Sequence, residues 1–206
     1  MTAAAPSRCV PAGRRGHPRD GDRAAAVTVV GLATTRDHPA EKVVRIRPIR
    51  PDDADELERF YADLSPDSRR RRFFSVSAGV SSRQSAGFCT TDHEHREGFV
   101  AVVDGNLAAY ERIVGHLCME PDEGPSVEVA IAVADAYQGQ RIGRRLMTAG
   151  IDWARHEGFA VLRATIFASN SAIDRLLIGT GLPTRQGDAG AGTTEIILDL
   201  LAAAAA

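Results

Sequence analysis

Features that would define a class of protein are scarce in this sequence. Its 206 residues include three cysteines, Cys9, Cys89 and Cys118, an odd number without metal-site spacing, so we expect reduced thiols in a cytoplasmic protein. The net charge of −2 indicates neither a nucleic-acid partner nor an acidic membrane partner. No apolar run approaches the roughly 20 residues that a membrane-spanning helix needs, and no internal repeat is apparent.

Two common nucleotide-binding motifs are also missing. The Walker pattern GxxxxGK[ST] does not occur in the chain. The Rossmann pattern GxGxxG fails because Gly139 and Gly143 are four residues apart, with no third glycine in register and no acidic residue after a second strand. If a phosphate ligand binds, a different motif must hold it.

The length allows one domain of ordinary size with additional tails. Residues 1–42 are rich in Ala, Arg, Gly and Pro and poor in aromatic residues, so we expect a mostly disordered tail there. An over-extended translation start is the alternative. We expect the folded domain to span residues 43–200, and residues 201–206 to form an Ala-rich tail.

Hydrophobic periodicity and turn residues divide this domain into alternating strands and helices. In the first helix Leu57, Phe60, Tyr61 and Leu64 form an apolar stripe, and Ser65 with Pro66 begins the next helix. The order predicts an α+β domain with a mixed sheet. We expect strands at 43–49, 98–106, 111–120, 127–133, 160–167 and 193–201, and helices at 51–64, 65–74, 81–88, 139–157 and 169–181.

The strand at 127–133 carries two different faces. Val127, Val129, Ile131 and Val133 alternate along one face and predict core packing, whereas Glu128 precedes three alanines on the other. An unpaired carboxylate in a central strand is costly, so this face indicates a site where a ligand lies along the backbone. A strand-end glutamate that faces water is the alternative.

A glycine-bearing turn and a basic helix start follow this strand. Arg141, Arg144 and Arg145 lie where the helix dipole disfavours cations by about 0.3–1 kcal/mol each. The first helical N–H groups have no partner within the helix and form an anion site, so a bound pyrophosphate would reverse that cost. A solvated basic helix start is equally compatible with the charges alone.

The segment "YQGQRIGRRLM" resembles the acetyl-CoA motif of the GNAT superfamily of N-acetyltransferases, [QR]-x-x-G-x-[GA]. Gln138 matches its first position and Gly143 its last, but Arg141 replaces the middle glycine. A side chain at that position requires helical backbone angles, which we expect here. The order of elements supports the resemblance, which covers about Val44 to Leu200 and implies the GNAT fold, with a mixed, mostly antiparallel sheet flanked by helices.

A second stretch resembles the start of bacterial protein lysine acetyltransferase domains. Its S-x-x-S-R-x-x-R-F-F pattern is matched between Ser65 and Phe74. In that subfamily a glutamate on the strand before the CoA loop is the general base, which implies this role for Glu128. The resemblance therefore implies transfer of an acetyl group from acetyl-CoA to an amine, with a protein lysine as the favoured acceptor.

The resemblance also implies a set of cofactor-binding residues and requires no metal. Backbone N–H groups from Ile131 to Ala134 would bind the pantetheine arm and polarise the thioester, while the turn would bind the pyrophosphate. Many relatives carry a tyrosine as general acid where this chain has Leu177. The leaving thiolate is therefore expected either to be protonated by water or to leave unassisted. The implied residues are Ile131, Val133, Gln138, Gly139, Gln140, Arg141, Ile142, Gly143, Arg144 and Asn170.

Other candidates have simpler explanations. His93 and His95 lack a second ligand cluster, so a solvated loop is favoured over a metal site. His116 is expected in the core or at a sheet edge, and Cys118 lacks a clear base for nucleophilic catalysis. Acetylation of a small amine and a non-catalytic acyl-CoA-binding module remain alternatives to lysine acetylation. We expect a monomer or a weak homodimer.

Overall fold

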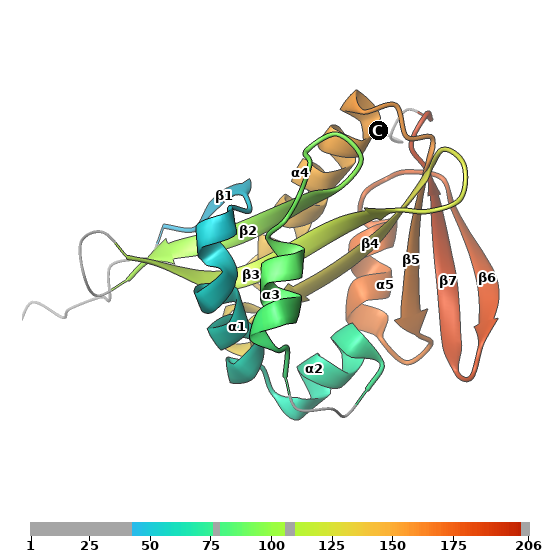
Figure 1. The fold of residues 1–206 in the computed structure, drawn as a ribbon. Helices are drawn as coiled ribbons and strands as arrows, with labels where there is room; N and C mark the ends of the chain where they lie inside the picture. The colour runs from blue at the N-terminus through green and yellow to red at the C-terminus, as the bar shows by residue number, and fades with distance from the viewer. Residues whose placement is uncertain (1–42, 76–78, 106–109, 203–206) are drawn as a thin grey trace, which may run out of the picture. The chain divides into compact units, whose positions relative to one another are not determined.

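The computed structural model describes residues 43–75, 79–105 and 110–202. Seven strands form one sheet in the order β1-β2-β3-β4-β5-β7-β6, and helices cover both of its faces (Figure 1). Every neighbouring pair is antiparallel except β4 and β5, which are parallel. The predicted α+β class with a mixed, mostly antiparallel sheet is confirmed. The predicted tail at 1–42 and the last four residues of the tail predicted at 201–206 lie outside the described residues.

The bounds of most elements agree with the sequence prediction. The strands are β1 Arg45–Pro48, β2 Glu97–Asp104, β3 Glu111–Pro121, β4 Ser126–Val133, β5 Val161–Phe167, β6 Thr184–Gly190 and β7 Thr193–Asp199. The α-helices are α1 Ala54–Asp63, α2 Pro66–Phe73, α3 Ser82–Phe88, α4 Ile142–His156 and α5 Ser171–Ile178, with short 3-10 turns at Pro51–Asp53 and Asp135–Tyr137.

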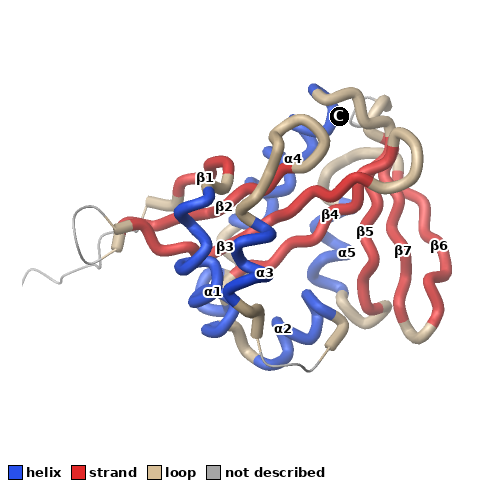
Figure 2. The backbone as a smooth tube through the Cα atoms, in the orientation of Figure 1, coloured by secondary structure: helices blue, strands red, loops and turns tan. Residues whose placement is uncertain are grey.

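Strand alternation divides the core into two parts. On one face, α4 and α5 pack against residues such as Leu117, Val127 and Leu162, all of them fully buried. On the other face, α1 and α3 pack against Val100 and its neighbours, and the predicted stripe of α1 is buried there. Figure 2 shows α1, α2 and α3 gathered in front of the sheet. The face of β4 that carries Glu128 is therefore on the side of α1 to α3.

Two differences from the prediction have local causes. The polar, glycine-bearing segment Thr184–Gly190 contains no apolar alternation, yet it forms β6 because it pairs with β7 at the edge of the sheet. Helix α4 begins at Ile142 rather than near Gly139, because both Gly139 and Arg141 have positive φ angles that a helix excludes. Gly158, with φ of +83°, follows its last turn as predicted.

Residues 43–202, as far as the structure describes them, contain no helix with the length and apolarity that crossing a membrane requires.

Replacement of Leu146 by alanine is expected to lower the free energy of unfolding by about 2–5 kcal/mol, because this fully buried side chain joins α4 to the sheet core. Urea denaturation followed by circular dichroism measures the change. The exposed Thr148 on the same helix is the control, and Thr148→Ala should change the stability by less than about 0.5 kcal/mol. Equal effects of the two substitutions would contradict the assigned core.

Candidate active site

Strands β4 and β5 separate soon after they meet. Their parallel pairing joins only Ser126–Glu128 with Val161–Arg163. Beyond this point β4 stays paired with β3 as far as Val133, whereas β5 continues beside β7 to Phe167 (Figure 1). The second half of β4 therefore has no strand on its β5 side.

This separation leaves particular backbone groups of β4 without a strand partner. The N–H of Ala134 donates to the carbonyl of Val114 at 2.9 Å, so the prediction that Ala134 offers a free amide is wrong. Because successive N–H groups in an antiparallel strand point to opposite sides, those of Ile131 and Val133 face away from β3. These are two of the residues that the sequence predicted as binding residues.

The turn after β4 departs from the predicted backbone. Arg141 has φ of 62° and ψ of 10°, which is left-handed, so the expectation of helical angles at this position is wrong. The turn needs the conformation that glycine adopts freely, and the arginine adopts it at a steric cost. Arg141 is the N-cap of α4 but its side chain does not cap the helix. The first N–H groups of α4, from Ile142 to Arg144, therefore have neither an intrahelical partner nor a cap from this residue.

The start of α4 lies close to β4 and α5 at Gly143. A Cβ atom at this position would lie 3.4 Å from Leu176 and 3.9 Å from both Ile131 and Val133, which are ordinary packing distances. The N-terminus of the helix is therefore beside the unpaired part of β4, and a small side chain such as alanine would also fit at this position of the motif.

The side chains of the turn have structural roles of their own. Gln138 donates to the carbonyl of Val133 at 3.1 Å and to Ser68 Oγ at 3.4 Å, and Gln140 donates to the carbonyl of Ala136. If these two glutamines bind a ligand, their backbone groups are the available ones. The predicted binding residues from Ile131 to Arg144 therefore lie in one region, and they offer a ligand mainly their backbone groups rather than their side chains.

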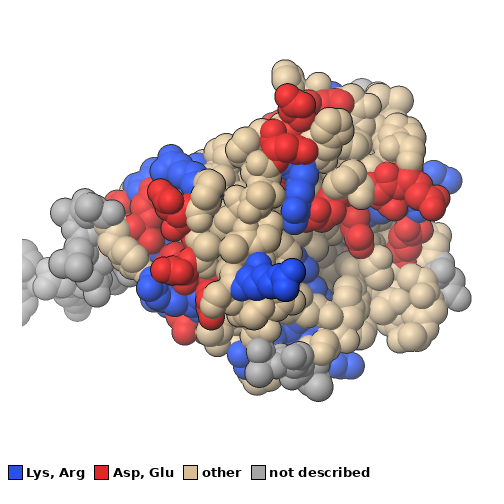
Figure 3. Space-filling model, in the orientation of Figure 1, with Lys and Arg blue, Asp and Glu red and all other residues tan. Residues whose placement is uncertain are grey.

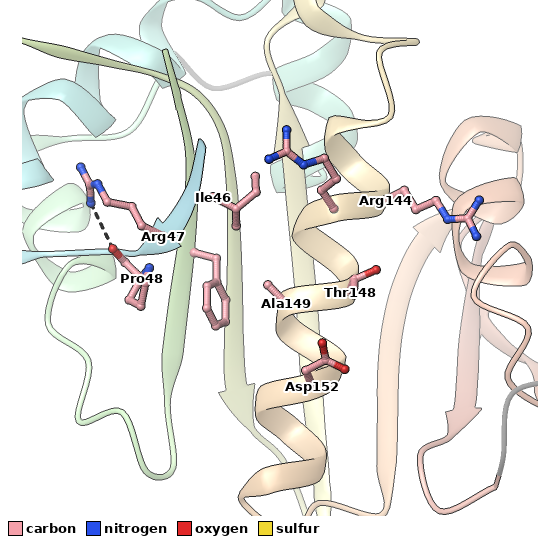
Figure 4. A pocket seen from close by; sticks show the side chains of 9 residues that line it. Ile46, Arg47, Pro48, Arg144, Thr148, Ala149 and Asp152 are labelled. Carbon is pink, nitrogen blue, oxygen red and sulfur yellow. Dashed lines mark hydrogen bonds between the residues drawn. The ribbon is translucent and has the colours of Figure 1, made fainter. Parts of the chain in front are cut away.

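A cavity of about 470 Å³ lies elsewhere, between β1 and α4. Figure 4 shows Ile46, Arg47 and Pro48 on one side of it and Thr148, Ala149 and Asp152 on the other, with Arg144 directed away from β1. This cavity is on the opposite side of α4 from the separation of β4 and β5, so it is not the predicted site.

Asp135, which the sequence analysis did not single out, joins α2 to the turn. Its carboxylate accepts hydrogen bonds from the backbone N–H of Ser65 at 2.9 Å, from Ser65 Oγ at 2.8 Å and from Ser68 Oγ at 2.8 Å. Partial burial acts to raise the pKa of Asp135, but these bonds outweigh it and the net shift is downward. The motif alone could not reveal this contact, because the partners are about 70 residues apart in the chain.

Glu128 lies in a row of charged side chains that crosses the sheet. It is opposite Glu120 on β3 and opposite Arg163 on β5, and its side chain is exposed. Glu120 pairs with Arg96 at 2.7 Å, and Arg163 pairs with Glu195 at 2.9 Å. No hydrogen bond or ion pair is found for Glu128 among the described residues. The predicted catalytic carboxylate is thus unpaired between two ion pairs.

Arg72 approaches Glu128 from α2 and is restrained by its own contacts. It lies within electrostatic range of both Glu128 and Tyr61, and it donates a hydrogen bond to Cys118 Sγ at 3.1 Å. Its guanidinium also stacks on the rings of Phe73 and Phe88. Arg72 therefore holds α2 against the sheet.

A buried pair supports this arginine. Tyr61 and His116 share a hydrogen bond of 2.7 Å and are both fully buried. Burial raises the pKa of Tyr61 to about 12 and, helped by Arg72, lowers the pKa of His116 to about 3, so both are neutral near pH 7. His116 is in the core, as predicted. Burial also raises the pKa of the Cys118 thiol, which disfavours a nucleophilic role.

The remaining sequence candidates lie apart from this row. His93 and His95 are exposed, and His93 pairs with Glu97. No group of three or more potential metal ligands occurs within the described parts of the chain. Asn170 precedes α5 without a side-chain cap and accepts a hydrogen bond of 3.4 Å from Arg71. Leu177 is fully buried in the core.

Comparisons with known proteins agree with this geometry. The sequence profile described as the Acetyltransferase (GNAT) family matches residues 54–177. "Acetyltransferase PA5475" of Pseudomonas aeruginosa is 31% identical over 140 residues, which cover 67% of this chain and 74% of that protein.

Solved structures give the same result. The GNAT domain of S. lividans PAT has a TM-score of 0.67 and 25% identity, and the match covers 76% of this chain and 90% of that one. The yncA protein of Salmonella typhimurium, solved with its cofactor acetyl-CoA, has a TM-score of 0.61 and 22% identity, with coverage of 79% and 96%. The second likeness concerns the fold alone.

Replacement of Arg141 by glycine is expected to stabilise the protein by up to about 1 kcal/mol, because glycine adopts the left-handed conformation without the steric cost. Thermal unfolding measures the change. The matched control is Arg144→Gly, which places glycine within the helix and should destabilise the protein by about 0.5–1 kcal/mol. A loss of stability in Arg141→Gly equal to that of the control would show that the conformation carries no strain.

Replacement of Asp135 by asparagine should lower the free energy of unfolding by about 1 kcal/mol, a modest loss because these charge-assisted bonds are exposed. The pKa of Asp135 is lowered in the folded state, so its contribution is present above the ordinary value of 3.8 and is lost as the pH falls through the lower folded value. Urea titrations at several pH values should therefore show the two proteins converging in acid. Asp67→Asn, which alters an exposed pair on α2, is the control.

Proposed function

The chain belongs to the GNAT acetyltransferase family, and from this premise we propose that it transfers an acetyl group from acetyl-CoA to a protein lysine, with Glu128 as general base. Membership of the family and the named relative make the chain an N-acetyltransferase. The observation that carries the finer proposal is the unpaired Glu128 carboxylate beside the free amides of β4.

The residues present fit acetyl-CoA. The N–H groups of Ile131 and Val133, on the open side of β4, are suited to the amide-bearing pantetheine arm and to the thioester oxygen. The uncapped N–H groups from Ile142 to Arg144, with Gly139, Gln140 and the guanidinium of Arg141, are suited to the pyrophosphate. When bound, acetyl-CoA supplies an activated acyl group for attack by an amine.

Glu128 provides the step that this chemistry needs at neutral pH. A lysine ammonium has an ordinary pKa near 10.4 and cannot attack until a base removes its proton. Glu128 is exposed to the acceptor side and is free of protein partners among the described residues, so its carboxylate can accept that proton directly or through water. Leu177, buried in the core, cannot protonate the sulfur, so the thiolate leaves without a side-chain acid from that position.

Three observations favour a protein lysine as the acceptor. The stretch Ser65–Phe74 matches the start of protein lysine acetyltransferase domains, and the S. lividans PAT domain has a similar structure. Figure 3 shows acidic side chains gathered over the part of the molecule where β4, β5 and β7 lie. The acidic residues in and beside this part of the sheet include Glu120 at the end of β3, Asp122 in the turn before β4, Glu128 of β4 and Glu195 of β7. Such a surface attracts cationic segments. The proposal includes a cytoplasmic location, a monomer or weak homodimer, and no nucleic-acid or membrane partner.

Glu128→Gln should lower kcat/KM by about 10²- to 10⁴-fold while leaving the dissociation constant for coenzyme A within about twofold, because the base is lost and the backbone amides remain. Acetyl transfer from labelled acetyl-CoA, read by mass spectrometry, and calorimetry provide the two measurements. Glu123→Gln in the turn before β4 is the control and should behave as wild type. Full activity of Glu128→Gln would contradict the proposed role of Glu128 as general base.

The same assay separates the alternative functions. Modification of lysine-containing proteins, without modification of free polyamines or aminoglycosides, would support the favoured acceptor. The reverse pattern would support a small-molecule acetyltransferase. Coenzyme A binding without turnover on any amine would indicate a binding module.

A further inference from the structure

Arg163 is the cation that lies opposite Glu128 on the neighbouring strand. The two residues are paired in register on the parallel strands β4 and β5. Both lie on the face opposite the α4 core, because their neighbours Val127 and Leu162 are buried in that core. Oppositely charged side chains that are neighbours on one face of a sheet attract each other.

The structure shows Arg163 paired elsewhere. Its Nη1 donates to Glu195 Oε1 of β7 at 2.9 Å, and its Nε lies 3.3 Å from Asp122 Oδ2 in the turn before β4. Glu195 lies diagonally across from Arg163, since its direct partner on β5 is Thr165. The contact between Nε and Asp122 is an ion pair without hydrogen-bond geometry. Glu195 therefore accepts the hydrogen bond that the structure shows from the outer nitrogens of this arginine.

The stability of the fold does not explain this arrangement well. Both side chains are about one-third exposed, and exposed ion pairs contribute little to stability. An ion pair between Arg163 and Glu128 would contribute about as much to the stability of the fold as the pair between Arg163 and Glu195. The difference between the two pairings is that one of them leaves Glu128 free.

The other charged groups near Glu128 have contacts of their own. Arg72 of α2 donates to Cys118 Sγ and packs over the rings of Phe73 and Phe88, although its Nε has no hydrogen-bond partner. Glu120 of β3 is paired with Arg96. The charged groups around Glu128 within the described residues are thus Glu120 from β3, Arg163 from β5, Arg72 from α2, and, one contact further away, Arg96, Asp122, Glu123 and Glu195.

We propose that Glu195 is a positioning residue that holds Arg163 away from Glu128, so that the Glu128 carboxylate stays available to the acceptor ammonium. This inference rests on the proposed function of Glu128 as base. Glu195 acts through Arg163 and has no contact with the reacting groups. Without Glu195, the guanidinium of Arg163 turns to Glu128. This ion pair makes the carboxylate a weaker base and blocks access of the cationic acceptor.

The test is Glu195→Gln, which keeps the size and polarity of the side chain and removes its charge. The acidic limb of the pH profile of kcat/KM should move to lower pH by about one unit, and the rate at neutral pH should fall by about tenfold. The dissociation constant for coenzyme A should not change. Glu123→Gln removes a nearby carboxylate that acts on Arg163 only at a distance, and it should leave the profile in place.

A double variant separates positioning from a structural defect. In the background of Arg163→Gln, there is no guanidinium to pair with Glu128, so adding Glu195→Gln should have no further effect on the profile. A defect of Glu195→Gln that persists in this background, or a single variant with a wild-type profile, would overturn the proposal.

A binding-independent measurement separates failure of this inference from failure of the proposed function. Carboxyl-carbon NMR, with the Glu128 signal assigned from its loss in Glu128→Gln, follows the titration of this group in wild type and in Glu195→Gln. A lower midpoint in the variant is expected, and an unchanged midpoint overturns the inference whatever the activity. Full activity of Glu128→Gln would instead overturn the role of the base.

Discussion

The short parallel contact between β4 and β5 is the constraint on which the site depends. It ends at Glu128 and Arg163, and from there each strand follows a different neighbour. The separation creates the two features that acetyl transfer needs in one place, because it leaves the amides of Ile131 and Val133 unpaired just beyond a carboxylate. A fully paired sheet would satisfy those amides and leave no backbone edge for a thioester.

The turn after β4 converts this edge into a binding site for a long ligand. Arg141 adopts a left-handed backbone conformation, and α4 starts at Gly143 close to Ile131 and Val133 of β4. The free N–H groups at the start of the helix are therefore near the free groups of the strand. Asp135, between the two, joins the same turn to α2, which carries the arginines near the acceptor side. Backbone geometry supplies most of the proposed contacts with coenzyme A.

Much of this arrangement could be predicted from the sequence, and the failures have physical reasons. The alternation in β4 revealed the two faces and Glu128, and the stripe of α1 revealed its buried side, because both patterns are local. β6 was missed because an edge strand is held by pairing with β7 rather than by its own apolar pattern. The backbone of Arg141 was predicted wrongly because the residue type favours one conformation and the turn imposes another. Asp135 and Glu195 were missed because their roles come from contacts between distant segments.

The row of charges that crosses the sheet has a consequence for how the strands align. Side chains alternate with a period of two, so a shift of β5 by one residue would turn Arg163 into the apolar layer beneath α4 and α5 and expose Leu162 in its place. The ion pair between β5 and β7 would be lost at the same time. The charged row therefore fixes the register of β5. Misaligned strands are disfavoured during folding at the place where β4 and β5 share only three paired positions.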